Sequence, residues 1–257
     1  MTNNQPEISS QKIADCVSHF RASKPHVHCI TNIVAQNFTA NVLLAAGATP
    51  SMTVAVSEIA SFVDMADALL INLGTLDPER MRSVHIAAEQ AKQANKPWAL
   101  DPVFVQASPN RLALAKFLLV EQPSLVRCNA VEGKTLLGDM FDVTDLSGLK
   151  EAGTSSFAVT GKEDLIWSSE QSFAVSNGHP FMDRITAMGC ALTGLIVGLM
   201  ATEEDHALAI VSALVMFGLA GEIAGQRSNG PGSFVPAFLD VLHNLNAEDI
   251  KQGAKFR

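Results

Sequence analysis

The chain has 257 residues, of which 47% are hydrophobic and 17% are charged, and its formal net charge is −8. This length and apolar content favour one α/β domain over residues 1–257 rather than two small domains. The acidic balance argues against a broad nucleic-acid surface, which needs clustered lysine and arginine. The four cysteines contain no Cys-x-x-Cys pair, which argues against both a zinc site and a disulfide framework.

The sequence carries no clear membrane or export signal. The polar first ten residues lack the charged-then-apolar order of a signal peptide. The longest apolar run, residues 190–201, is shorter than the ~20 residues that a membrane-spanning helix needs. We therefore expect no membrane partner and a cytoplasmic protein with reduced thiols.

As far as residue 137, short apolar runs alternate with longer helical patterns, which is typical of a parallel sheet covered by helices. The predicted strands cover residues 27–30, 50–54, 68–71, 98–100 and 124–126. The predicted helices cover residues 36–46, 57–65, 77–95, 109–119 and 130–137. Ser57 is the expected N-cap of the second of these helices, and Pro78 fits the first turn of the third.

After Gly153 the pattern changes to three closely spaced apolar runs, which predict an antiparallel edge built from hairpins. These runs cover residues 157–159, 165–167 and 173–175, and the predicted helices that follow cover 189–201, 205–226 and 233–245. The fold class is therefore α/β, with a mostly parallel central sheet, helices on both faces and antiparallel edge strands.

Polar side chains come directly after the predicted strands, where open parallel sheets bind ligands. The main ones are Asn32, Asn72, Asp101, Arg127 with Glu132 one turn on, and Thr160. Asp101 and Glu132 offer the hard oxygen ligands that Mg²⁺ prefers, and Arg127 offers a planar fork for a polyphosphate. Each residue could instead serve only as a turn, a helix cap or an ion-pair partner.

The turn at residues 187–190 places small residues and a thiol at the start of an apolar helix. The free amides of a helix start can hold a phosphate, and the same partial charge lowers the pKa of a cysteine there. We expect Cys190 to be biased toward the thiolate and to act as a base for phosphoryl transfer to a hydroxyl. The alternative is that Gly189 and Cys190 simply allow close packing of a buried helix.

Two common nucleotide motifs are absent: the sequence contains no Gly-x-x-x-x-Gly-Lys-Ser/Thr and no Gly-x-Gly-x-x-Gly. A P-loop or a dinucleotide-binding Rossmann site is therefore disfavoured. The turn at 187–190 remains the expected phosphate site.

Nearly the whole chain resembles the hydroxyethylthiazole kinase family of the ribokinase-like superfamily. The resemblance rests on the order and spacing of several short segments rather than on any one of them. These are VHCITN at 27–32, GATPSM at 47–52, NLGTL at 72–76, LDPV at 100–103, RCNAVE at 127–132, VTG at 159–161, NGHP at 177–180, GCALT at 189–193 and GPGSF at 230–234.

This resemblance implies Mg²⁺- and ATP-dependent phosphorylation of the hydroxyl of 4-methyl-5-(2-hydroxyethyl)thiazole, for thiamine biosynthesis by salvage. It also implies a homotrimer with the thiazole site between subunits. The site residues carried over are Met52, Asn32, Gly74 and Ala187 for the thiazole, Arg127, Thr160 and Gly189 for ATP, Asp101 and Glu132 for the metal, and Cys190 for catalysis.

The chain departs from the family at the turn, where Ala187 and Met188 replace the usual Gly-Thr, so turnover is expected to be affected more than the fold. Three other functions stay open. Cys190 could be a covalent nucleophile activated by His179 or His28. The acceptor could be another small alcohol, such as a hydroxymethylpyrimidine. The chain could also bind its ligand without catalysis.

Overall fold

The structure, a computed structural model, describes residues 8–257. Its centre is an eight-stranded sheet with strand order β2-β1-β3-β4-β5-β6-β7-β8. The strands are β1 (His26–Ile30), β2 (Thr49–Ser51), β3 (Ala68–Asn72), β4 (Trp98–Asp101), β5 (Leu125–Asn129), β6 (Ser156–Thr160), β7 (Asp164–Ser168) and β8 (Gln171–Val175). Strands β1 to β6 run parallel, whereas β7 is antiparallel to both β6 and β8. The predicted sheet, with its antiparallel edge, is confirmed.

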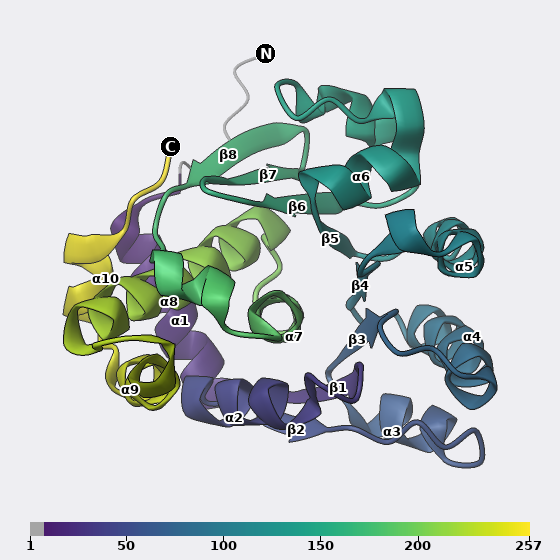
Figure 1. Cartoon of the computed structure of the whole chain (residues 1–257), viewed down its shortest axis with the longest axis horizontal. Coiled ribbons are helices and arrows are strands. Elements are labelled where there is room, and N and C mark those ends of the chain that lie inside the picture. Colours follow the sequence, from purple (N-terminus) through teal and green to yellow (C-terminus); the bar gives the residue numbers. More distant parts are fainter. Residues whose placement is uncertain (1–7) are drawn as a thin grey trace.

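Helices cover both faces of the sheet, as predicted. They are α1 (Ser10–Ser23), α2 (Gln36–Ala46), α3 (Ile59–Met65), α4 (Pro78–Gln93), α5 (Pro109–Val120), α6 (Ala130–Leu137), α7 (Met188–Met200), α8 (His206–Arg227), α9 (Pro231–Asn244) and α10 (Ala247–Gly253). Figure 1 shows α3 to α6 on one face and the other helices on the opposite face. Each helix layer buries its own apolar cluster against the sheet, so the two layers hold the strands from both sides.

Helix α8 lies in the middle of the larger layer and packs against α7, α9 and α1. In the part of the chain that the structure describes, it is the one helix long and apolar enough to cross a membrane. The expectation that no segment is long enough is therefore wrong for α8. However, 89% of its apolar window is buried inside the protein, which is the environment of a core helix.

Several element boundaries differ from those predicted. The N-cap of α3 is Glu58 rather than Ser57, and no side chain caps this helix. Strands β3 to β6 reach one to three residues further than predicted, so the polar residues expected just beyond them form the strand ends. The sequence reading also missed α1 and α10. Helix α1 is held by its buried face and by the Ser9 cap.

Candidate active site

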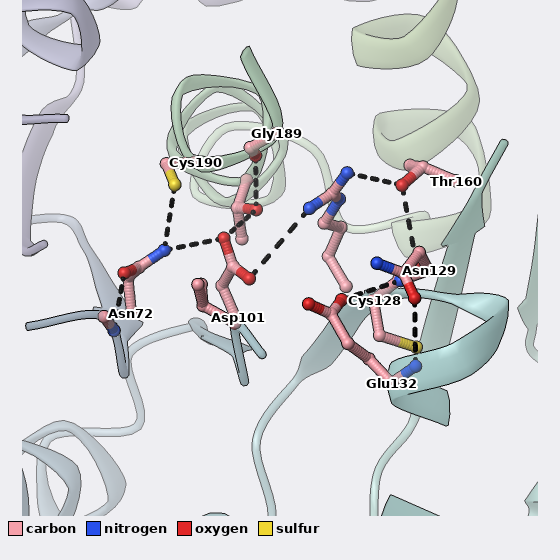
Figure 2. A network of polar contacts seen from close by, with 12 residues as sticks. Asn72, Asp101, Cys128, Asn129, Glu132, Thr160, Gly189 and Cys190 are labelled. Atoms are coloured by element: carbon pink, nitrogen blue, oxygen red, sulfur yellow. Dashed lines mark hydrogen bonds and ion pairs between the residues drawn. The ribbon is translucent and has the colours of Figure 1, made fainter. Parts of the chain in front are cut away.

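The polar side chains that end the parallel strands meet at one edge of the sheet, as predicted. Asn72 ends β3 and Asp101 ends β4, and the two residues are paired in register. Asn129 of β5 is paired in the same way with Thr160 of β6. Parallel pairing therefore brings these strand ends to a common edge, where α/β proteins bind ligands. Figure 2 shows these side chains lying across from the first turn of α7.

The first turn of α7 faces this edge with unused backbone amides. No side chain caps the helix, so its first N–H groups lack intrahelical acceptors and carry partial positive charge. The N-cap, Ala187, has φ 70° and ψ 3°. This left-handed conformation costs an alanine about 1–2 kcal/mol, and glycine adopts it freely. The turn thus offers amides to an anion, and Ala187 occupies a position that suits glycine.

Asp101 is fully buried at the centre of the edge. Its Oδ2 accepts hydrogen bonds from Asn72 Nδ2 at 2.8 Å and from Thr193 Oγ1 at 3.3 Å. Its Oδ1 has no hydrogen-bond partner in the described chain, and Arg127 Nη1 lies 4.0 Å away. Burial raises the pKa of Asp101 to about 6, although the nearby Arg127 charge lowers it. Asp101 is therefore a carboxylate at neutral pH with one buried oxygen that lacks a hydrogen-bond partner among the described residues.

Arg127 links Asp101 to the next strand and to α7. Its guanidinium donates to Thr160 Oγ1, while its buried Nε has no partner among the described residues. It also packs directly on the backbone of Gly189, where any side chain would overlap Nη1. Arg127 therefore contacts both of the other predicted ATP-binding residues, Thr160 and Gly189.

Glu132 is also buried, but both of its carboxylate oxygens already accept backbone hydrogen bonds. Oε2 accepts from the amide of Asn129 at 3.0 Å within the capping box of α6, and Oε1 accepts from the amide of Phe104 at 2.8 Å. Val103 and Phe104 have φ values of 27° and 55°, which are unusual for side chains of this size. Glu132 therefore holds the loop after β4 in a strained conformation, directly beside Asp101.

Cys190 is linked to Asp101 through the amide of Asn72, and Asn32 and Asn72 donate to its Sγ at 3.4 Å and 3.2 Å. Burial raises the pKa of this thiol to about 12, and the Asp101 charge adds to the rise. The Arg127 charge and the two amide donors lower it by less. The expected bias toward the thiolate is therefore wrong for the unliganded protein, because burial outweighs the helix terminus.

The predicted thiazole residues lie on the other side of Cys190 from Arg127. Asn32 donates to Asn72 Oδ1 at 3.1 Å, and a Cβ at Gly74 would lie only 2.7 Å from Asn32 Cβ. Gly74 is therefore needed for this close approach. Met52 directly follows the edge strand β2, where it is half-buried against the larger apolar cluster. The structure thus brings Asn32 and Gly74 together and places Met52 two strands away from Gly74.

A cavity of about 690 Å³ opens beside Arg127, Thr160 and Gly189, and this volume is within the range of small-molecule sites. Much of its wall was not anticipated from the sequence: Asp164, the segment 176–183, Leu214, Phe217 and Gly218. The missed signal is a glycine row on α8. Side chains at Gly218, Gly221 or Gly225 would overlap Asn177, Met182 or His179 of that segment.

The alternative in which a histidine activates Cys190 lacks support in the geometry. His28 is fully buried in β1 and bonds to Ser51 Oγ at 2.7 Å and to the Thr53 carbonyl at 3.1 Å. His179 caps the following turn and stacks against Phe234. Within residues 8–257, the hydrogen bonds of Cys190 Sγ come from the two asparagines, so neither histidine is positioned as its base.

Comparisons with known proteins identify the family of the chain. The model of the hydroxyethylthiazole kinase family matches residues 17–248. A probable hydroxyethylthiazole kinase of Agrobacterium fabrum is 41% identical over 247 residues, covering 96% of this chain and 95% of that protein. The structure of a hydroxyethylthiazole kinase protein from Pyrococcus horikoshii is 36% identical with a TM-score of 0.90, covering 95% of this chain and 98% of that one.

The fold extends to more distant kinases. A Staphylococcus aureus pyridoxal kinase, solved in complex with ADP, superposes with a TM-score of 0.63 at 15% identity over 77% of this chain and 88% of its own. At this identity the likeness concerns the ribokinase-like fold alone. The family model and the full-length relatives go further, and they establish that this chain belongs to the hydroxyethylthiazole kinase family.

Proposed function

We propose that this chain transfers the γ-phosphoryl group of ATP to the hydroxyl of 4-methyl-5-(2-hydroxyethyl)thiazole, giving the thiazole phosphate for thiamine salvage. Family membership supports the reaction. The observation that carries it in this chain is the arrangement around Asp101. A buried carboxylate with one unpartnered oxygen lies beside Arg127 and faces the free amides of α7.

The two substrates approach Cys190 from opposite sides. ATP binds in the cavity, where Arg127, Thr160 and the Gly189 backbone hold its phosphates. The thiazole binds near Asn32, Gly74, Met52 and Ala187. This division is supported by the close approach of Asn32 and Gly74 on one side, and by the contacts of Arg127 with Thr160 and Gly189 on the other. It places the hydroxyl of the acceptor close to the phosphate that the α7 amides hold.

Cys190 takes the proton of the acceptor hydroxyl. A thiol must first lose its own proton to do so, and a pKa of about 12 leaves very little thiolate at neutral pH. Phosphoryl transfer is tolerant of a weak base, because its transition state depends mainly on positioning and charge neutralisation. We therefore expect slow turnover that increases with pH.

Mg²⁺ fits the chemistry of the site. Among residues 8–257, no cluster of three or more His, Cys, Asp or Glu side chains could hold a metal by itself. Mg²⁺ commonly uses one or two carboxylates together with water and substrate phosphates, however. Asp101 would hold it through the unpartnered Oδ1, and Glu132 would hold a bound water, because both of its oxygens already accept amides. When bound, the ion neutralises phosphate charge.

The protein is proposed to be a cytoplasmic homotrimer. The support is a set of exposed apolar side chains just before and within α2, beside the sheet end formed by β1 and β2. Ile33, Val34 and Leu44 are 64%, 59% and 57% exposed. A second copy would cover these side chains, and sedimentation velocity would measure the assembly size.

The deciding experiment supplies purified protein with Mg-ATP and the thiazole alcohol and follows ADP release. The expected result is thiazole-dependent ADP formation, with the hydroxymethylpyrimidine a much poorer acceptor in competition. Preferred use of the pyrimidine would reassign the acceptor. Thiazole binding without any ADP release would contradict the catalytic proposal and indicate a binding protein.

A further inference from the structure

The β6–β7 turn, residues 161–163, borders the cavity next to Thr160 and is held firmly at both ends. The Gly161 amide donates to Asp164 Oδ1 at 3.0 Å. The Glu163 carboxylate accepts from Ser176 Oγ at 3.0 Å and from Arg257 Nη2 at 2.8 Å. The turn therefore has a fixed shape before any ligand binds.

Lys162 lies between these two anchors and is itself exposed. Across residues 8–257, the structure shows no hydrogen bond and no ion pair for its ammonium group. Other exposed lysines do have such partners: Lys134 pairs with Asp139 at 3.5 Å, and Lys255 with Glu222 at 2.8 Å. Lys162 is thus an uncommitted cation on a rigid turn at the rim of the cavity.

The cavity needs a second cation if it takes a polyphosphate. Arg127 and Lys162 are the only arginine and lysine among the residues that line it. The Arg127 guanidinium is already shared between Asp101 and Thr160. Two acidic side chains, Asp164 and Asp183, also face the cavity and oppose a bound anion. One shared arginine leaves several phosphate charges without a cationic partner.

We propose that Lys162 binds the polyphosphate of the nucleotide from the turn side, opposite the amides of α7. This deepens the proposed function and rests on it for the identity of the nucleotide. Lys162 acts in binding rather than in proton transfer, because its turn lies beyond Thr160 and away from Cys190. It therefore distinguishes a nucleoside triphosphate from the uncharged nucleoside.

The test compares the variants Lys162→Met, Lys162→Arg and Lys134→Met with the wild type. Lys134→Met is the matched control, because it removes an exposed lysine outside the cavity. The KM for ATP should increase about tenfold in Lys162→Met, the size expected for one charge-assisted phosphate contact, while kcat changes less than about threefold. Lys162→Arg should restore most of the affinity, and added salt should raise the KM of the wild type more steeply than that of Lys162→Met.

Equilibrium binding separates this inference from the reaction itself. The dissociation constants of a non-hydrolysable ATP analogue and of adenosine are measured for each variant, with thermal melting as a check on folding. Support requires that Lys162→Met weaken only the charged analogue. An unchanged affinity for the analogue, or an equal loss for adenosine, would overturn the inference. A wild type that binds ATP but phosphorylates no thiazole would refute the proposed reaction and leave this test intact.

Discussion

The two sides of Asp101 differ in how completely the protein satisfies its own polar groups. On the amide side, formed by Asn32, Asn72 and Gly74, the side-chain amides bond to each other, to Asp101 and to Cys190. On the cationic side, formed by Arg127, Thr160 and Lys162, the Arg127 Nε and the Lys162 ammonium remain without partners in the described chain. The polar groups of the amide side therefore have hydrogen-bond partners without a ligand. Those of the cationic side lack partners that a bound anion would supply.

Removal of the Asp101 charge, which lies between the two sides, should decrease activity more than any other substitution. In Asp101→Asn the new side chain can keep an acceptor for Asn72, but it lacks the carboxylate that opposes Arg127 and suits Mg²⁺. We expect kcat to decrease by about 10³-fold or more. The variant should melt at the same temperature or higher, because burial disfavours the charged form of Asp101. Retention of a tenth of the activity would contradict the central role of this residue.

Cys190→Ala removes the thiol that is proposed to act as the base. We expect kcat to decrease by about 10²-fold, with little change in the affinity for ATP. The kcat of the wild type should increase with pH from 7 to 9, because the pKa of the thiol is about 12, and the variant should lack this increase. Equal turnover in the variant, or the same pH profile, would remove the proposed base.

Gly189→Ala should weaken ATP binding on the cationic side and leave thiazole binding on the amide side unchanged. Its new methyl group would overlap the Arg127 guanidinium and displace it from Thr160. We expect the KM for ATP to increase by about 10- to 50-fold. This is the size expected for the loss of one to two charge-assisted hydrogen bonds. Thiazole affinity, measured by calorimetry, should stay within a factor of about two. A parallel loss of both affinities would show that the two sides are not independent.

The titration of Asp101 sets a lower pH limit for activity. Its pKa is raised to about 6, so its carboxylate is present above that pH and is protonated below it. In Cys190→Ala, which lacks the titration of the thiol, we expect kcat/KM for ATP to be about tenfold lower at pH 5 than at pH 7. Measurements at constant ionic strength test this, and Asp101→Asn introduced into the same variant should remove the decrease.

Ala187→Gly should have the smallest effect and acts where the amide side meets α7. Glycine removes the cost of the left-handed backbone, but it also gains freedom in the unfolded chain. We expect a gain in stability of less than about 1 kcal/mol and an increase in kcat of about two- to threefold. Denaturant unfolding and steady-state kinetics measure both. A lower kcat would show that the alanine side chain itself contributes to the site.

The sequence predicted the sheet and the convergence of Asn72, Asp101, Arg127 and Thr160, because hydrophobic periodicity and strand ends are local features. It missed α1, although the buried residues Ile13, Cys16, Val17 and Phe20 follow helical spacing. It also missed the cavity wall at 176–183. That wall depends on the packing of a loop against α8, which no local pattern reveals.

The pKa of Cys190 shows a different limit. A helix N-terminus is visible in the sequence and lowers the pKa of a thiol. Burial and the neighbouring Asp101 charge are set by residues distant in the chain, and they dominate. The same holds for Glu132. Its sequence position suggests a metal ligand, whereas in the fold its oxygens are engaged by the backbone amides of Asn129 and Phe104.

The glycine row on α8 couples nucleotide affinity to a core helix that also lines the cavity with Leu214 and Phe217. Gly218, Gly221 and Gly225 lie on the face of α8 that receives the segment 177–182. A methyl group at any of them would displace that segment, which lines the proposed ATP cavity. Changes deep in the core would thus alter substrate preference and not stability alone. Adaptation of this enzyme to a different phosphate donor can therefore begin in a core helix.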